Sequence, residues 1–261
     1  MLAETRGIPV NDSIKIFDVQ DHTHQRYVRN VNCWAYPLDL TSISPWNSAG
    51  RNRKAGTLIT PRHVLWARHY SMPLNTTIRF VDRNNTIVDR TITKTKAVPT
   101  HGHAYISGYD IVVAELDSDV PPEISFSKVM PKSLSTIRPP SSIHVPVFHT
   151  DFEEKALVAD LRYESNSMVY LYIPQANTTR QQFFESKISG DSGNPVFMLI
   201  NNEPVLMFMF TYGGAGSGTS ITFHYDDINN ILQGWGSSYK LTDIDLSLYL
   251  DTGDVIPSII G

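Results

Sequence analysis

A serine set between two glycines gives this chain its clearest potential for chemistry. Residues 190–195 read Gly-Asp-Ser-Gly-Asn-Pro. Because glycine adopts backbone angles that other residues avoid, this segment can turn tightly and aim the Ser192 hydroxyl and nearby backbone N–H groups at one point. A nucleophile beside donors for the oxyanion that it creates is what acyl-transfer chemistry needs. Such a serine also needs a base, and a carboxylate to orient that base.

The six residues resemble the active-site serine loop of the chymotrypsin/trypsin family of serine proteases. Most members of that family have a further glycine after the second glycine of the loop, whereas this chain has Asn194. Glycine, aspartate and serine also dominate ordinary turns. The resemblance therefore depends on a base and a carboxylate occurring where the family has them.

Two histidines are candidates for the base. Residues 56–69 read GTLITPRHVLWARH and resemble the family's hairpin, which ends in a short helical turn carrying the catalytic histidine. His69 follows the apolar run 64–66 and matches that position. His63 falls in the hairpin turn, where we expect it to lie in solvent. We expect His69 to be the base, since an imidazole can accept a proton near neutral pH.

The candidate carboxylate is Asp110, which opens the apolar run 111–116. It resembles the family's aspartate, which also precedes a strand rich in isoleucine and leucine. Asp110 lies 41 positions after His69 and 82 positions before Ser192. The order and approximate spacing are those of the family, whereas other serine hydrolase folds use other orders. A buried Asp110 would hold one tautomer of His69 and stabilise the imidazolium formed during catalysis.

The resemblance also implies an oxyanion hole and a way of holding the loop. In the family, the hole is formed by the backbone N–H groups of the serine and of the glycine two residues before it, here Ser192 and Gly190. Cleavage of trypsin-like zymogens frees an Ile-Val-Gly-Gly end that pairs with the aspartate before the serine, here Asp191. The chain has no such tetrapeptide upstream. We therefore expect another donor to hold Asp191, without cleavage.

Four further residues are implied as substrate-binding. The base of the family's specificity pocket lies six residues before the serine, at Ser186, which carries no charge; a shift of one residue would place the acidic Glu185 there instead. The family's substrate-binding strand ends in Ser or Thr, an aromatic residue and Gly, and Thr211, Tyr212 and Gly213 match this pattern. By the same resemblance, Thr211 is expected to donate a hydrogen bond to Asp110. An open, uncharged pocket favours a large apolar or aromatic side chain at P1, the substrate residue before the cleaved bond.

The pattern of apolar runs and turn residues along the chain predicts an all-β fold. The chain has 261 residues, 41% of them hydrophobic, and short β-rich runs alternate with turn residues, as in an antiparallel sandwich or barrel. With the resemblance, this predicts two antiparallel Greek-key barrels with the active site in the cleft between them. The predicted organisation is an N-terminal extension (1–29), a first barrel (30–120), a connection (121–142), and a second barrel (143–261) with a helix near 226–234 and a tail strand.

Other features predict neither a cofactor nor a further class of partner. The pairs His22/His24 and His101/His103, with His144 and His149 as extras, lack a second ligand cluster at metal-site spacing, so we expect no metal. A formal charge of −4 gives no support for nucleic-acid binding, and no segment approaches a membrane span. Cys33 lies beside Trp34 in an apolar run, which predicts a buried, inert thiol rather than a second nucleophile.

The expected activity is that of a serine endopeptidase acting on protein or peptide substrates. Two alternatives remain open: a catalytically silent protease fold used for binding, and an acyl hydrolase or esterase with the same triad. The resemblance implies an exported protein, although residues 1–5 lack the apolar core of a secretory signal.

Overall fold

The computed structural model of the chain describes residues 13–45, 54–105, 108–134, 144–165 and 167–248. Strands dominate, and within this part the one α-helix is α3 (Tyr225–Gly234). The all-β class with a short C-terminal helix is therefore confirmed. Asp226 and Asp227 lie in the first turn of α3, where carboxylates favour the positive end of the helix dipole.

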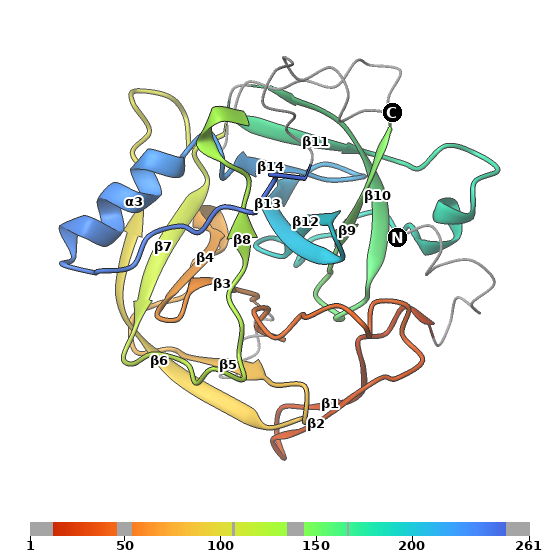
Figure 1. The fold of residues 1–261 in the computed structure, drawn as a ribbon, viewed down its shortest axis with the longest axis horizontal. Coiled ribbons are helices and arrows are strands. Elements are labelled where there is room, and N and C mark those ends of the chain that lie inside the picture. Colours follow the sequence, from red (N-terminus) through yellow and green to blue (C-terminus); the bar gives the residue numbers. More distant parts are fainter. Residues whose placement is uncertain (1–12, 46–53, 106–107, 135–143, 166, 249–261) are drawn as a thin grey trace.

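The first β unit is an antiparallel sheet with the strand order β3-β4-β7-β6-β5 (Figure 1). Its strands are β3 (Thr57–Thr60), β4 (His63–Ala67), β5 (Thr77–Val81), β6 (Ile87–Ala97) and β7 (Ile111–Leu116). The two end strands do not pair with each other, so the first of the two predicted barrels is a half-barrel sheet. The segment 42–44 bonds to the backbone of Gly56 and Leu58 instead, and so covers the edge of β3 that a closing strand would use.

The second β unit is a closed barrel of six antiparallel strands in the order β12-β9-β10-β11-β14-β13, closed by pairing of β13 with β12. Its strands are β9 (Val145–His149), β10 (Leu157–Ser165), β11 (Met168–Tyr172), β12 (Pro195–Ile200), β13 (Glu203–Tyr212) and β14 (Ser217–Ser220). Residues 205–210 of β13 are all buried, which explains the unbroken apolar run in this part of the sequence.

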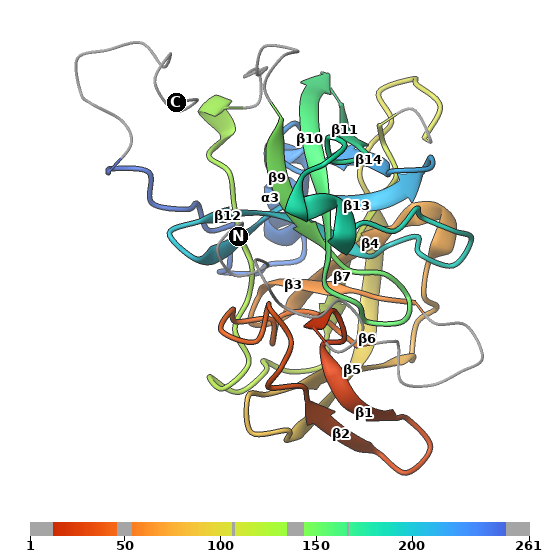
Figure 2. The ribbon, with the colours of Figure 1, turned by 90° about the vertical axis from the view of Figure 1, so that its right-hand side faces the viewer.

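The predicted N-terminal extension is part of the folded structure from residue 13 onward. It forms the hairpin β1 (Phe17–Asp21) and β2 (Arg26–Arg29), which lies beside β5 in both views (Figures 1 and 2). Phe17 and Tyr27 are buried and pack edge to face, with ring centroids 5.5 Å apart. Sequence periodicity missed this hairpin because its strands are short and few of its side chains are buried. Residues 1–12 lie outside the described part.

The connection and the C-terminal tail run side by side. The connection carries β8 (Lys128–Val129), which pairs with β13 in parallel, and the short 3-10 helix η2 (Lys132–Leu134). Its last eight residues, 135–142, lie outside the described residues. Val129 bonds to Thr242 and Ile244 of the tail, and Leu241, Ile244 and Leu246 of the tail are buried. The tail therefore packs on the barrel as predicted, but through an isolated bridge rather than a full strand.

Candidate active site

Three side chains from distant parts of the sequence form one hydrogen-bonded chain. His69 Nδ1 lies 2.6 Å from Oδ2 of Asp110, and His69 Nε2 lies 2.7 Å from Oγ of Ser192. Asp110 is fully buried, whereas 28% of the His69 side chain is exposed. The structure thus brings together the hydroxyl, the imidazole and the carboxylate that the sequence singled out. In this geometry the imidazole can take the hydroxyl proton while the carboxylate orients it.

Strand register explains why His69 and Asp110 meet. Ala67, the last residue of β4, lies opposite Ile111, the first residue of β7. His69 lies just past β4 in the 3-10 helix η1 (Arg68–Tyr70), the short helical turn expected there. Asp110 lies just before β7, at the same end of the sheet. The other oxygen of its carboxylate, Oδ1, accepts the backbone N–H of His69 at 2.8 Å, so Asp110 fixes both the backbone and the ring of His69.

The Ser192 loop enters β12 through two glycines with positive φ. Gly190 has a φ of 109° and Gly193 a φ of 86°, which other residues rarely adopt. At Gly193 a side chain would also meet the carbonyl oxygen of Ala55 at 3.3 Å. The loop therefore packs against the half-barrel at Gly193, and this close approach positions Ser192 beside His69.

The backbone N–H groups of Gly190 and Ser192 are available to a ligand. Within the described residues neither group donates a backbone hydrogen bond, whereas the intervening Asp191 N–H donates to Ile188. These are the two donors that the resemblance implied for an oxyanion hole. Donors of this kind are what the oxyanion of a tetrahedral intermediate requires.

Asn194, the departure from the family motif, makes contacts that a glycine cannot make. It is fully buried. Its side-chain oxygen accepts the Thr150 hydroxyl at 3.0 Å, and its side-chain nitrogen donates to the backbone carbonyl of Asp191 at 3.0 Å. The substitution therefore ties the serine loop to residue 150 and closes the loop on itself.

Asp191 is held by donors of the chain itself, as the sequence led us to expect. Its carboxylate is buried and accepts the backbone N–H groups of Phe152 at 3.1 Å and Ile188 at 2.8 Å. Backbone donors of this kind stabilise an ionised carboxylate. Asp191 is thus hydrogen-bonded to two segments of the chain, and neither donor is a chain end freed by cleavage.

Thr211 does not contact Asp110, so the predicted hydrogen bond from Thr211 is wrong. The Thr211 hydroxyl is buried and has no hydrogen-bond partner among the residues that the structure describes. The pairing of β13 with β14 shifts register between Phe210 and Tyr212, and a bulge of this kind re-aims a side chain. Thr219 on β14 occupies the expected role in part: its hydroxyl accepts the backbone N–H of Asp110 at 2.9 Å.

His224 is a second residue that sequence reasoning missed. It is fully buried, just before α3. Its Nε2 donates to the carbonyl of Gly108 at 2.7 Å, and its Nδ1 lies 2.8 Å from Oδ2 of Asp227. His224 thus fixes the segment that leads into Asp110. The only sequence signal was its place directly before the predicted helix.

The predicted substrate-binding residues lie on two segments that a backbone hydrogen bond joins. The N–H of Lys187 donates to the carbonyl of Gly214 at 2.7 Å, which joins the segment carrying Ser186 to the end of β13. Ser186 is exposed, and so is Tyr212, at 47%. Gly213 has a φ of 96° and ends the strand beside Tyr212.

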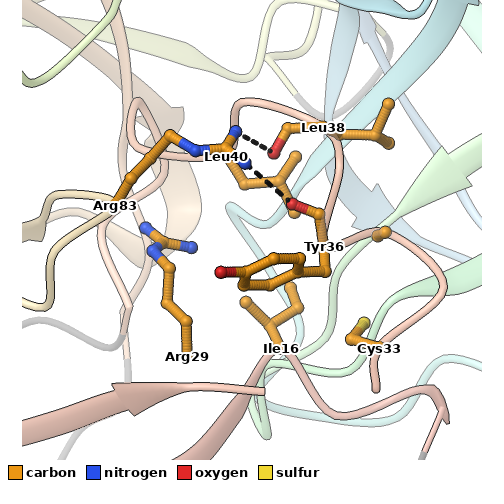
Figure 3. A pocket seen from close by; sticks show the side chains of 8 residues that line it. Ile16, Arg29, Cys33, Tyr36, Leu38, Leu40 and Arg83 are labelled. Carbon is orange, nitrogen blue, oxygen red and sulfur yellow. Dashed lines mark hydrogen bonds between the residues drawn. The ribbon is translucent and has the colours of Figure 1, made fainter. Parts of the chain in front are cut away.

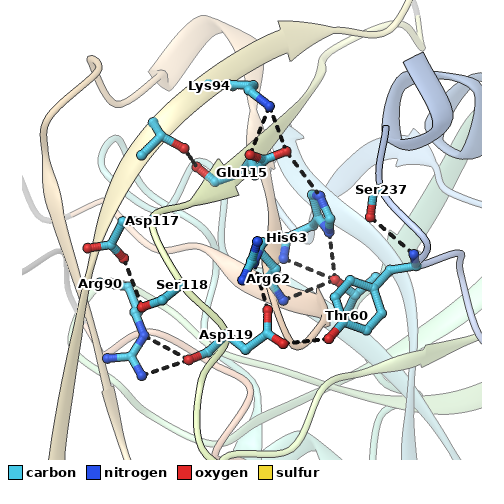
Figure 4. Close-up of polar contacts among 12 residues, drawn as sticks. Thr60, Arg62, His63, Arg90, Lys94, Glu115, Asp117, Ser118, Asp119 and Ser237 are labelled. Carbon is cyan, nitrogen blue, oxygen red and sulfur yellow. Dashed lines mark hydrogen bonds and ion pairs between the residues drawn. The ribbon is translucent and has the colours of Figure 1, made fainter. Parts of the chain in front are cut away.

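The second candidate base, His63, is buried, so its expected exposure was wrong. Its Nδ1 lies 2.7 Å from the Thr60 hydroxyl, and its Nε2 lies 3.7 Å from a Glu115 oxygen (Figure 4). Trp235 stacks on its ring and Tyr239 meets it edge-on. The sequence around the hairpin could not reveal this cover, because both aromatic residues come from the C-terminal segment. Burial lowers the pKa of His63 to about 4.

Cys33 lines a small cavity beside the N-terminal segment rather than the candidate active site (Figure 3). The thiol is buried, which raises its pKa to about 11, so it carries no thiolate at neutral pH. Arg83 donates to the carbonyls of Tyr36 and Leu38, and Arg29 donates to the backbone of residues 81 and 82. The burial predicted for Cys33 is confirmed.

The paired histidines contact other side chains. His24 contacts Asp21 and His22 contacts Tyr27, whereas His101 and His103 both pack against the ring of Tyr109. In the described ranges no three His, Cys, Asp or Glu side chains gather in a way that could hold a metal ion. None of the helices described has the length and apolar character needed to cross a membrane.

Comparisons of the chain with protein-family models and with curated proteins found no match.

Proposed function

We propose that this protein is a serine endopeptidase that resembles the chymotrypsin/trypsin family and cleaves peptide bonds through an acyl-enzyme. One observation carries the proposal: His69 lies 2.7 Å from Ser192 and 2.6 Å from the buried Asp110. The base is thus within hydrogen-bond distance of both the nucleophile and the orienting carboxylate, which is the geometric requirement for this mechanism.

Acylation begins at the Ser192 hydroxyl. Oγ attacks the scissile carbonyl carbon as His69 Nε2 takes its proton, and the carbonyl oxygen becomes an oxyanion facing the N–H groups of Gly190 and Ser192. The C–N bond then breaks, and His69 returns the proton to the leaving amine. Asp110 remains ionised and stabilises the imidazolium between these two transfers.

Deacylation repeats the steps with water as the nucleophile. His69 takes a proton from water, the hydroxide adds to the acyl carbon, and the C–O bond to Ser192 breaks. His69 returns the proton to Oγ, which releases the carboxylic acid and restores the hydroxyl. No redox change occurs, and water is the only co-reactant.

A neutral P1 pocket is favoured over an acidic one by the position of Glu185. The Glu185 carboxylate pairs with Lys155, a cation that also contacts Glu153 and Asp151. The acidic alternative for the pocket base is therefore engaged elsewhere, which leaves the uncharged Ser186. This arrangement supports large apolar or aromatic P1 residues.

A fluorophosphonate probe tests the nucleophile. We expect the probe to label the wild-type protein and to leave Ser192→Ala unlabelled. Ser118→Ala is the matched control, because Ser118 is exposed and lies outside the candidate site, and it should label normally. A wild-type protein that resists the probe would support the silent, binding-only alternative and reject the enzyme.

A peptidase assay then separates amide from ester hydrolysis. Wild-type protein should cleave casein or a mixed peptide library, and Ser192→Ala should lose about 10³-fold or more of that rate. Hydrolysis of p-nitrophenyl esters with no cleavage of peptides would instead identify an acyl hydrolase.

A further inference from the structure

Buried ionisable side chains lie together beneath the Ser192 loop. Lys187, His149, Asp151 and Asp191 are all at most 8% exposed. None of them belongs to the hydrogen-bonded chain of Asp110, His69 and Ser192. Charged groups are rarely buried without a reason, because removal from water is costly unless partners compensate.

Lys187 contacts several of the segments around this cluster. Its ammonium donates a hydrogen bond to the backbone carbonyl of Thr150 and lies 5.4 Å from the centre of the Phe210 ring. Its own backbone N–H donates to Gly214. One residue therefore links the segment before the serine loop to residue 150, to β13 and to the turn after β13.

Lys187 contacts Thr150 and Phe210, and both residues hold the loop through hydrogen bonds. The Thr150 hydroxyl donates to Asn194, and the N–H of Phe152 donates to the Asp191 carboxylate. On the other side, the backbone of Phe210 accepts the N–H of Gly193 at 2.9 Å and donates to the carbonyl of Asn194 at 2.8 Å. Each of these bonds ends on residues 191–194.

The charges around Lys187 favour its cationic form and oppose the cost of burial. The net pKa of Lys187 is lowered to about 8, and burial is the largest cause. The charges of Asp191, Asp151 and Glu185 act to raise this pKa, whereas the charge of Lys155 lowers it. Lys187 also depresses the pKa of the buried His149, which adds to the larger effect of burial on that imidazole. At neutral pH, Lys187 is thus a cation beside two buried carboxylates.

We infer that Lys187 is a positioning residue for the oxyanion-hole loop: from beneath, its side chain holds residues 190–194 in the conformation that presents Ser192 and the Gly190 N–H, without touching substrate. The inference rests on the proposed function. In the uncleaved chain, the Lys187 side chain and its contacts with Thr150 and Phe210 would then form an internal brace for this loop.

Lys187→Met removes the amine and keeps most of the side-chain volume. It leaves the Thr150 carbonyl without its donor and removes a positive charge that acts on Asp191, whereas Asp151 keeps its ion pair with Lys155. We expect kcat to fall about 10²-fold, the scale seen when an oxyanion donor or a reacting group is displaced, with KM changed less than threefold. Lys187→Arg, which keeps a charged donor, should recover at least tenfold of this loss.

Lys128→Met is the matched charge control. Lys128 pairs with Glu203 at the start of β13, seven positions before Phe210, and neither residue bonds to the loop, so its loss should change kcat less than twofold. An equal fall in kcat in Lys128→Met and Lys187→Met would overturn the inference, since a general charge effect would then explain both.

Amide hydrogen exchange tests the brace without relying on activity. In Lys187→Met, peptides covering residues 188–194 should exchange at least tenfold faster than in the wild type, while peptides covering β4 and β7 should be unchanged. Unchanged exchange at 188–194 overturns the inference even if the protein is an active protease. If instead the wild type is inactive, faster exchange still supports the brace, and the proposed function alone fails.

A second variant guards against misfolding of Lys187→Met. Thr150→Val keeps the backbone carbonyl that Lys187 contacts but removes the hydroxyl bonded to Asn194. We expect it to loosen residues 191–194 in the same exchange experiment by a smaller factor. Full protection of these amides in Thr150→Val would contradict the linkage from Lys187 through residue 150.

Discussion

The hydroxyl of Thr219 accepts the backbone N–H of Asp110 at 2.9 Å, although the two residues lie 109 positions apart. Thr219 belongs to β14 of the closed barrel, whereas Asp110 leads into β7 of the half-barrel. Both are fully buried. This bond therefore joins the two β units directly behind the carboxylate that orients His69.

Replacing Thr219 with valine should loosen Asp110. The change keeps the side-chain shape but leaves a buried N–H without an acceptor, which costs about 1–3 kcal/mol. We expect urea unfolding to show a loss of this size and kcat/KM to fall about tenfold, as a barrier increase of about 1.4 kcal/mol would give. Unchanged kcat/KM would mean that this bond does not position Asp110.

Replacing Thr211 with valine should have the opposite result. The Thr211 hydroxyl is buried without a hydrogen-bond partner in the described part of the chain, so its removal relieves a desolvation cost of about 1 kcal/mol or more. We expect equal or higher resistance to urea and kcat/KM within about twofold of the wild type. A large loss of activity would instead support the hydrogen bond from Thr211 to Asp110 that the sequence predicted.

Gly190→Val should remove activity while the fold persists. Gly190 has a φ of 109°, and a side chain there would find only Phe152, at 3.9 Å. The obstacle is thus backbone strain rather than crowding, since β-branched residues avoid positive φ. Distortion of the turn should cut kcat by about 10²-fold or more, with a near-native far-UV CD spectrum. Gly234→Ala, at the end of α3 with nothing within 4 Å, serves as the control and should stay active.

The buried His63 should make the protein less stable in acid. Its pKa is lowered to about 4 by burial, against about 6.5 in the unfolded chain. The unfolded state therefore takes up the proton first, and stability falls as the pH drops from about 6.5 towards 4, by up to ~3 kcal/mol. Urea unfolding at pH 7 and pH 4.5 should show a smaller loss in His63→Gln than in the wild type. His24→Gln, at an exposed position, should leave the wild-type dependence intact.

The uncharged Ser186 should set the substrate preference. In a panel of peptides that differ only at P1, we expect Phe and Leu to be cleaved at least tenfold faster than Arg and Lys, since burial of a large apolar side chain contributes about 1–3 kcal/mol. Faster cleavage after Arg would reject the neutral pocket and point to Glu185. Ser186→Asp should raise the ratio of Arg to Phe cleavage.

Local patterns were enough to predict much of this protein. The apolar runs around β4, β5, β7 and β13 indicated strands because alternating or continuous burial leaves a periodic trace in the sequence. The acidic start of α3 indicated the helix. The candidates His69, Asp110 and Ser192 came from three short segments that resemble those of a protease family, each spanning only a few residues.

The sequence by itself determined which hydroxyl, imidazole and carboxylate were available and at which strand ends they lie. Tertiary structure alone decided which groups support them. Thr219 rather than Thr211 bonds to Asp110 because the pairing of β13 with β14 shifts register between Phe210 and Tyr212. His63 is buried because Trp235, from the C-terminal segment, stacks on its ring. The half-barrel, likewise, is left unclosed because the segment 42–44 covers β3. Each outcome depends on contacts between residues far apart in sequence, and such contacts leave no periodic signal in either partner.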